Sequence, residues 1–236
     1  MSKILYGIGV GPGDPELMTL KALRCIGESD VIILPAEPKE ECYAYHIVKK
    51  AYPRIEEKEI LCMPFPMLKD KELLKKAHDR IYEDIAGLLA ENKTVAFLTL
   101  GDPALYSTYS YIHDRALKEK KTAVIISGVP SFCAVAAALG ISLGSSKEEI
   151  HIIPGSYDIN HTLELSGTKI YMKSGKKLEE LKKVLFEYER RERLEIYAVS
   201  NCGMEDELVT SGLHSLREHK GYLTTVIVKA KEGRGG

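Results

Sequence analysis

Residues 7–15 read Gly-Ile-Gly-Val-Gly-Pro-Gly-Asp-Pro, and a second Gly-Asp-Pro stands at residues 101–103. Each stretch directly follows an apolar run, which predicts a turn at the end of a buried strand. The four glycines of the first stretch indicate that the backbone approaches another group closely, where a side chain would be in the way. In an open α/β sheet, ligands bind outside the carboxyl ends of the strands. We therefore expect both glycine turns to lie at one ligand-binding edge of an α/β sheet.

The composition is that of an ordinary globular protein. The chain has 236 residues, of which 44% are hydrophobic and 28% charged, and this length suits one large domain or two small ones. A formal net charge of −1 gives no broad attraction to nucleic acid or to an anionic membrane. The sequence shows neither a signal-peptide pattern nor an apolar run of transmembrane length. These features predict a cytoplasmic protein that binds neither nucleic acid nor membrane.

The cysteines and histidines form no pattern typical of a metal site. The five cysteines are scattered along the chain without a Cys-x-x-Cys pair, which favours reduced thiols in a cytoplasmic protein. His214 and His219 are five residues apart, but no third ligand is evident near them. We therefore expect no metal ion held by the protein itself.

Strand and helix patterns alternate through the first half of the chain, which predicts a parallel sheet. The alternation ends in a polar, glycine-containing stretch at residues 140–149, which reads as a linker. We expect two α/β domains: residues 1–143 with the parallel sheet and the glycine turns, and residues 144–236 with a mixed sheet. The strands expected are 3–9, 31–34, 95–100, 123–126, 150–154, 169–173, 196–200 and 223–229, and the helices are one begun by Asp14 and those over 40–51, 69–91, 107–119, 131–139 and 177–190.

The glycine turns do not fit the common phosphate-binding motifs. In the pattern G-x-G-x-x-G the sixth position is Pro12 when counted from Gly7 and Asp14 when counted from Gly9. No stretch of the chain satisfies the P-loop pattern. Asp14 and Asp102 would also place negative charge near a phosphate, so a ligand with positive charge or hydroxyl groups fits better. The alternative is that both stretches are simply tight turns with helix caps.

A third turn extends this edge. Residues 127–131 read Ser-Gly-Val-Pro-Ser, follow the expected strand at 123–126 and open a helix of small residues. Taken alone, this stretch is equally consistent with a ligand-binding turn and with an ordinary turn between a strand and a helix. As the third such turn in one parallel sheet, it is expected to lengthen the ligand-binding crevice.

In these stretches the chain resembles the tetrapyrrole methyltransferases, which use S-adenosylmethionine to methylate the corrin precursor ring. The resemblance implies two α/β domains with the cofactor in the cleft between them, a homodimer, and a fold unlike that of Rossmann-type methyltransferases. Residues 105–108, Leu-Tyr-Ser-Thr, and the Val-Pro-Ser-Phe turn resemble the branch that methylates carbon 20 of the ring. The matching stretches, in the order of the family, are Gly9–Leu20, Leu98–Tyr111, Ser127–Gly140, Tyr171–Lys173 and Val199–Glu207.

The resemblance also implies which residues bind the cofactor and the ring. Position 130 departs from the family, because proline stands where serine or threonine is common, and a hydroxyl contact there would fall to Ser131 or to the backbone. Without the resemblance, Met172 would be read as an ordinary core residue. The implied cofactor-binding residues are Pro12, Gly101, Asp102, Leu105, Pro130, Ser131, Met172, Cys202 and Thr225, and the implied substrate loop contains Gly11, Gly13 and Asp14.

No clear catalytic base emerges from the sequence. Asp102 and Tyr106 are the candidates for proton transfer, although the more natural role of Asp102 is to orient the cofactor. Tyr109 and Tyr111 follow the same loop and either contact the ring or pack a helix. Lysines and arginines at the rim of the cleft are expected to bind the carboxylates of the substrate.

The implied reaction is methylation of carbon 20 of cobalt-factor II (cobalt-precorrin-2) by S-adenosylmethionine, in cobalamin biosynthesis. The five free cysteines suit a reducing cell interior and incline us toward this cobalt-containing substrate over metal-free precorrin-2. Two further alternatives remain open: another tetrapyrrole or diphthine-type methyltransferase of the same superfamily, and a ligand-binding module without catalysis.

Overall fold

The computed structural model describes residues 3–66, 70–145, 147–154, 158–173, 177–188 and 194–230. The chain divides into two compact units, Met1–Pro130 and Ser131–Gly236. This division falls before helix α5 (Ser131–Leu139), whereas the sequence pattern placed it after residue 143. The reason is that α5 packs on strands β8 (Leu194–Ser200) and β10 (Thr224–Ala230) of the second unit.

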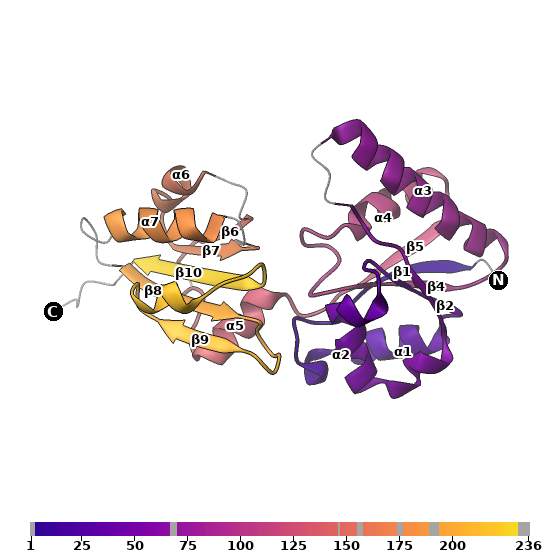
Figure 1. The fold of residues 1–236 in the computed structure, drawn as a ribbon, viewed down its shortest axis with the longest axis horizontal. Helices are drawn as coiled ribbons and strands as arrows, with labels where there is room; N and C mark the ends of the chain where they lie inside the picture. Colours follow the sequence, from indigo (N-terminus) through magenta and orange to yellow (C-terminus); the bar gives the residue numbers. More distant parts are fainter. Residues whose placement is uncertain are drawn as a thin grey trace. The chain divides into compact units, whose positions relative to one another are not determined.

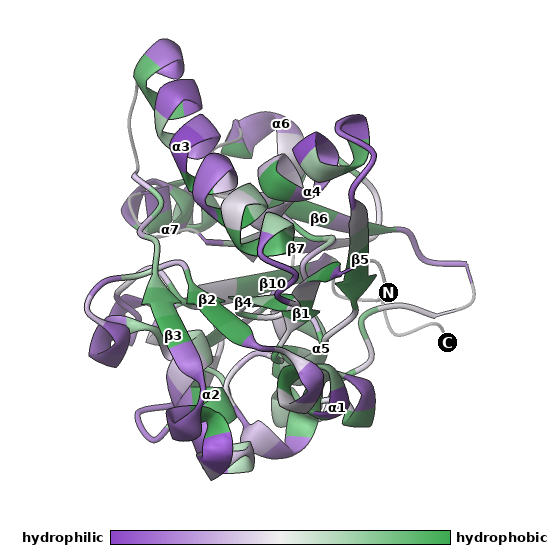
Figure 2. Ribbon diagram, turned by 90° about the vertical axis from the view of Figure 1, so that its right-hand side faces the viewer, coloured by the Kyte–Doolittle hydropathy of each residue, from purple (hydrophilic) through white to green (hydrophobic). Residues whose placement is uncertain are grey.

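The first unit contains a five-stranded sheet of order β3-β2-β4-β1-β5, in which all neighbours run parallel (Figure 1). Strands β2 and β4 are buried along their whole length, as expected for central strands that are covered on both faces, and β2 is hydrophobic throughout (Figure 2). The sequence pattern did not predict the short edge strand β3. The strands are β1 (Ile4–Gly9), β2 (Val31–Leu34), β3 (Glu59–Cys62), β4 (Val95–Thr99) and β5 (Thr122–Ile126).

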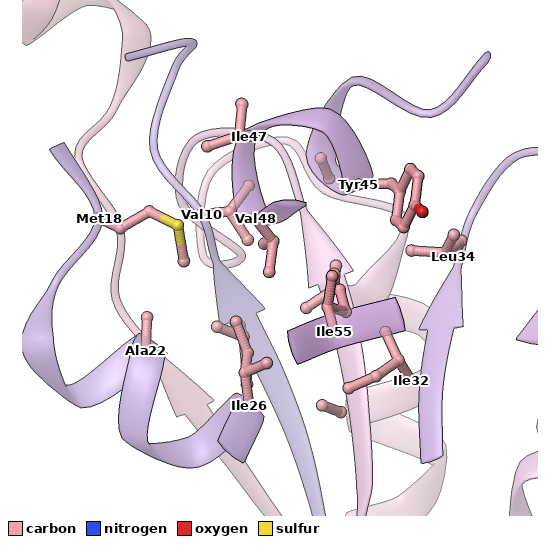
Figure 3. Close-up of a cluster of buried hydrophobic side chains, with 14 of the residues drawn as sticks. Val10, Met18, Ala22, Ile26, Ile32, Leu34, Tyr45, Ile47, Val48 and Ile55 are labelled. Atoms are coloured by element: carbon pink, nitrogen blue, oxygen red, sulfur yellow. The ribbon is translucent and has the colours of Figure 1, made fainter. Parts of the chain in front are cut away.

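Helices cover both faces of this sheet (Figure 1). Helices α1 (Leu20–Glu28) and α2 (Tyr43–Ala51) lie on one face, over a core that includes Ile26, Ile32 and Val48 (Figure 3). Helices α3 (Lys71–Ala90) and α4 (Tyr109–Lys118) lie on the other face. Packed side chains therefore cover both faces of the sheet from whose carboxyl edge the turns project.

The first helix begins later than the sequence analysis expected. The Asp14 carboxylate caps only a 3₁₀ turn, Pro15–Leu17, where it accepts a 2.8 Å hydrogen bond from the backbone N–H of Glu16. The cap of α1 is Thr19, whose Oγ1 accepts from the backbone N–H of Ala22 at 3.1 Å. Asp14 therefore caps the 3₁₀ turn and Thr19 caps α1, whereas the sequence pattern predicted one helix capped by Asp14.

The second unit contains the mixed sheet that was expected, with order β6-β7-β10-β8-β9 (Figure 1). Strands β6 (Ile150–Pro154) and β7 (Thr168–Met172) are parallel, and the other neighbours, including β9 (Leu208–Ser211), are antiparallel. Helices α6 (Ile159–Leu163) and α7 (Leu178–Tyr188) pack on one face. Residues 189 and 190 of the helix expected over 177–190 lie outside the described residues.

Alternation along the strands decides which side chains face α5. Tyr171, Ala198 and Val226 belong to the core beneath α6 and α7. Their neighbours Met172, Val199 and Thr225 therefore point to the opposite face of the sheet, the face on which α5 packs. Across the parts of the chain that the structure describes, none of the helices combines the length and apolar character needed to cross a bilayer.

Candidate functional site

The turns after β1, β4 and β5 meet backbone against backbone. Gly11 and Gly101 form an antiparallel bridge, in which the N–H of Gly101 donates to the carbonyl of Gly11 at 2.8 Å. A Cβ on Gly9 would lie 2.5 Å from the carbonyl oxygen of Gly101 and 2.6 Å from the backbone N of Gly128. A Cβ on Gly128 would collide with the same Gly101 oxygen. The sequence prediction that these turns converge on one edge of the sheet is confirmed, and only glycine permits the approach.

Asp102 ties two of these turns together. One carboxylate oxygen, Oδ1, accepts from the N–H of Ala104 at 2.7 Å, and Oδ2 accepts from the N–H of Gly128 at 3.1 Å. The first bond closes the loop after β4, and the second reaches across to the turn after β5. The geometry therefore gives Asp102 a role in shaping the edge, and both of its oxygens are already engaged with backbone donors.

The remaining predicted residues of the first unit line the same turns. Pro12 and Gly13 are buried, whereas Leu105 and Pro130 are half-buried. Tyr106 is 46% exposed and has a positive φ of 49°, a backbone conformation that is costly for a residue with a side chain. Such strain is typical of loops at functional sites.

The two other tyrosines of this segment separate into packing and surface roles. Tyr109 is fully buried, and its ring occupies the space where a side chain on Gly7 would lie. Burial raises the pKa of its hydroxyl well above the ordinary value, so it stays protonated. Tyr111 is 57% exposed, and its ring centroid lies 4.5 Å from that of His78 on α3. Tyr109 therefore packs the core, and Tyr111 packs against α3.

In the second unit, the predicted residues lie at the ends of strands. Met172 ends β7 and Thr225 lies in β10, each only 5% exposed, and both face the α5 side of the sheet. Cys202 follows β8 in a turn that Asn201 begins with a φ of 52°. The N–H of Asn201 donates to the carbonyl of Leu223 at 3.1 Å, which holds this turn against the start of β10. Ser131 is the first residue of α5.

The electrostatics of the turns in the first unit favour a cation. Residues 7–15, 99–108 and 126–131 contain no lysine or arginine, and their charged residues are Asp14 and Asp102. In the part of the chain that the structure describes, neither carboxylate pairs with a basic side chain, and two such carboxylates disfavour a phosphate and suit a positively charged ligand. Among the described residues, no group of three or more His, Cys, Asp or Glu side chains is placed to hold a metal ion.

Sequence reasoning missed one contact that supports these turns. Thr19 Oγ1 lies 3.5 Å from the carbonyl oxygen of Ser127, so the cap of α1 also reaches the turn after β5. The available signal was a threonine shortly before the apolar-periodic residues of the helix, which is a capping pattern. Its second partner lies 108 residues away in the sequence. No local pattern indicates a contact of that range.

Comparison with known proteins shows the family to which the chain belongs. The family model of the tetrapyrrole (corrin/porphyrin) methylases matches residues 4–216. The chain is 38% identical over 232 residues to a probable cobalt-precorrin-2 C(20)-methyltransferase of Methanocaldococcus jannaschii, with 96% of each chain covered. It is 26% identical over 242 residues to a precorrin-2 C(20)-methyltransferase of a Sinorhizobium species, covering 98% of this chain and 96% of the relative.

The fold is also that of a solved enzyme. A cobalt-precorrin-4 methyltransferase has a TM-score of 0.75 to this structure at 19% identity, with 96% of this chain and 94% of that chain covered. The family match and the Methanocaldococcus jannaschii relative together make the chain an S-adenosylmethionine-dependent C-methyltransferase with two α/β units. More particularly, the chain belongs to the tetrapyrrole (corrin/porphyrin) methylases.

Proposed function

We propose that this chain methylates carbon 20 of cobalt-factor II (cobalt-precorrin-2) in cobalamin biosynthesis. The observation that carries the proposal is the similarity over 96% of both chains to the archaeal relative whose name states this reaction. The Leu-Tyr-Ser-Thr segment at residues 105–108, which resembles the carbon-20 branch, supports the same position on the ring. The metal-free ring is the second candidate, since a relative named for metal-free precorrin-2 is similar over nearly the whole chain at lower identity.

The proposed donor site comprises the residues that the resemblance implies in each unit. Pro12, Gly101, Asp102, Leu105 and Pro130 contribute from the first unit, and Ser131, Met172, Cys202 and Thr225 from the second. The negative charges of Asp14 and Asp102 fit the positive charge of S-adenosylmethionine. When bound, this donor supplies a methyl group that its sulfonium makes electrophilic. The substrate loop is proposed to contain Gly11, Gly13 and Asp14.

The task of the protein in this reaction is to align the two reactants. Holding two reactants in a reactive geometry lowers a barrier by about 7–11 kcal/mol. The glycine turns suit this task because the backbones of Gly9 and Gly128 pack directly against the Gly101 carbonyl. Asp102 orients the donor loop through its two backbone hydrogen bonds, and Tyr106, whose ring is half-exposed on a strained backbone, is the candidate for contact with the ring or its departing proton.

Calorimetric titration with S-adenosylhomocysteine tests the donor site. The unaltered protein should bind this product, and Asp102→Ala should bind it about tenfold more weakly, because two charge-assisted hydrogen bonds that shape the loop are lost. Asp84→Ala is the matched control, since Asp84 is an exposed carboxylate on α3. Absence of binding by the unaltered protein would overturn the proposal.

Assays with the two ring substrates test the second half of the proposal. The chain should methylate cobalt-factor II faster than metal-free precorrin-2, with the new methyl group at carbon 20 by NMR. Preference for the metal-free ring would move the assignment to the second candidate. Methylation at another carbon would place the chain in another branch of the family.

We also propose that the chain is a homodimer, as the resemblance implies. Equilibrium sedimentation should give twice the mass of 26.3 kDa calculated for one chain.

A further inference from the structure

A buried chain of hydroxyl groups and one imidazole joins three strands of the second unit. His219 is completely buried, and its Nδ1 lies 2.7 Å from Ser200 Oγ at the end of β8. Its Nε2 lies 2.7 Å from Thr210 Oγ1 on β9. Ser200 Oγ lies 2.8 Å from Thr224 Oγ1 at the start of β10. One side chain thus links β8, β9 and, through Ser200, β10.

The backbone carbonyls near Thr224 favour one set of directions for the hydrogen bonds among these four side chains. Thr224 Oγ1 lies 3.2 Å from the carbonyl oxygen of Gly221 and 3.4 Å from that of Lys220, and a carbonyl only accepts. We assign the Thr224 proton to these carbonyls, so that Thr224 accepts from Ser200. Ser200 in turn accepts from Nδ1–H of His219, which leaves Nε2 to accept from Thr210. A neutral imidazole with its proton on Nδ1 satisfies every member of the chain.

The charged groups around the ring are consistent with the neutral form. Lys182 of α7 donates to the carbonyl of His219 at 3.0 Å and pairs with Glu179 at 2.7 Å. Glu218 is the neighbouring residue. Burial lowers the pKa of His219 below its ordinary value, and the Lys182 ammonium adds to this against the opposing effect of Glu218.

The hydroxyl groups of Ser200 and Thr224 lie next to two proposed donor-binding residues. Ser200 directly precedes the turn that begins with Asn201 and carries Cys202, and Thr224 directly precedes Thr225. Cys202 and Thr225 are both proposed donor-binding residues. Because a hydrogen bond at one residue restricts the backbone of the next, anchoring Ser200 and Thr224 restricts the two donor-binding positions.

We propose that His219 is a positioning residue for the methyl donor, and that it acts through Nδ1–H and Ser200 rather than through Nε2 and Thr210. This inference rests on the proposed function, because it assumes that Cys202 and Thr225 contact the donor. His219 itself is completely buried and does not touch the donor.

Four single variants separate positioning from simple stabilisation. His219→Asn keeps an amide donor near the place of Nδ1, whereas His219→Gln keeps an amide near the place of Nε2. Ser200→Ala removes the partner on the Nδ1 side, and Thr210→Val removes the partner on the Nε2 side with little change of shape. Each variant loses one hydrogen bond of the ring, so all four are expected to lower the melting temperature.

Only two of the four should weaken donor binding. In titrations with S-adenosylhomocysteine, His219→Gln and Ser200→Ala should raise Kd about three- to tenfold, and His219→Asn and Thr210→Val should leave it within about twofold. The KM for S-adenosylmethionine should follow Kd, with kcat largely retained. Independently, the ¹⁵N shifts of the imidazole in the unaltered protein should report a neutral ring protonated on Nδ1.

The outcomes distinguish this proposal from the function on which it rests. If the unaltered protein binds no S-adenosylhomocysteine, the proposed function fails. If it binds and all four variants bind equally well, or lose affinity in proportion to their melting temperatures, the positioning role is wrong and the function stands. A ring protonated on Nε2 also overturns the positioning role. If a histidine variant fails to fold, the comparison of Ser200→Ala with Thr210→Val decides the question.

Discussion

Individual glycines at the edge of the first sheet are required for different reasons. Gly101 has a φ of 75°, but a Cβ there would meet no atom within 4 Å, so its requirement is conformational. Gly128 is the reverse case. Its φ is not positive, but a Cβ there would collide with the Gly101 carbonyl, so its requirement is steric. The sequence indicates that glycines cluster in these turns, but it does not separate the two causes. That distinction depends on contacts between segments far apart in the chain.

The space around Gly128 and around Gly87 predicts opposite effects on stability when each is changed to alanine. Gly128→Ala should destabilise the protein by about 1–3 kcal/mol, because a methyl group is forced into packed backbone. Gly87→Ala should stabilise it by about 0.5–1 kcal/mol, because Gly87 lies within helix α3 and a Cβ there meets nothing within 4 Å. Urea unfolding followed by circular dichroism measures both. Equal effects of the two changes would show that steric exclusion at Gly128 is absent.

The elements that the sequence predicted best are those whose pattern lies entirely within a short local stretch of residues. The bounds of β2 and α5 are as expected, because an unbroken apolar run and a run of small residues lie between clear turn residues. Strands β3 and β9 and the five-residue helix α6 were missed, since each is too short to show a period. Met172 shows the same limit within the site. Its side chain faces the α5 side only because of the register of β7, and one strand alone does not reveal which side is covered.

The two caps that precede α1 give a prediction for this element. Thr19→Val should lower the free energy of unfolding by about 1 kcal/mol, because the N–H of Ala22 loses its acceptor and the contact with the Ser127 carbonyl is lost. Asp14→Ala should cost less, since Asp14 caps a 3₁₀ turn of three residues. Thermal unfolding of the two variants makes the comparison. A larger cost for Asp14→Ala would mean that the helix depends on the earlier residue, as the sequence pattern suggested.

At the scale of the whole molecule, two histidines in different units make stability depend on pH. Burial lowers the pKa of His78 in α3 and of His219 below the ordinary value of 6.5, with Asp79 opposing the effect at His78 and Glu218 at His219. An unfolded chain therefore binds protons more readily than the folded protein at mildly acidic pH. By linkage, the stability from these groups is complete above pH 6.5 and is lost as the pH falls through the lowered pKa values.

Carboxylates with lowered pKa contribute in a different range. Burial opposes the charge of Glu148, but its bonds to Thr168, the N–H of Ser145 and Lys229 outweigh this and lower its pKa, so its contribution is lost only below the ordinary pKa of 4.5. Between pH 6.5 and pH 4.5, the two histidines therefore account for most of the change in the free energy of unfolding. The free energy of unfolding should thus fall between about pH 7 and about pH 5.5, by at most about 1.4 kcal/mol per pH unit for each proton.

Urea unfolding at these two pH values measures the slope, and the double variant His78→Asn/His219→Asn provides the control. The variant should be less stable at neutral pH and nearly independent of pH across the window, because it lacks both groups that gain protons on unfolding. An equally steep fall in the variant would assign the pH dependence to other groups. Because a proton gained by His219 is added at Nε2 and leaves Nδ1–H donating to Ser200, the affinity of the folded protein for S-adenosylhomocysteine should not fall along with its stability.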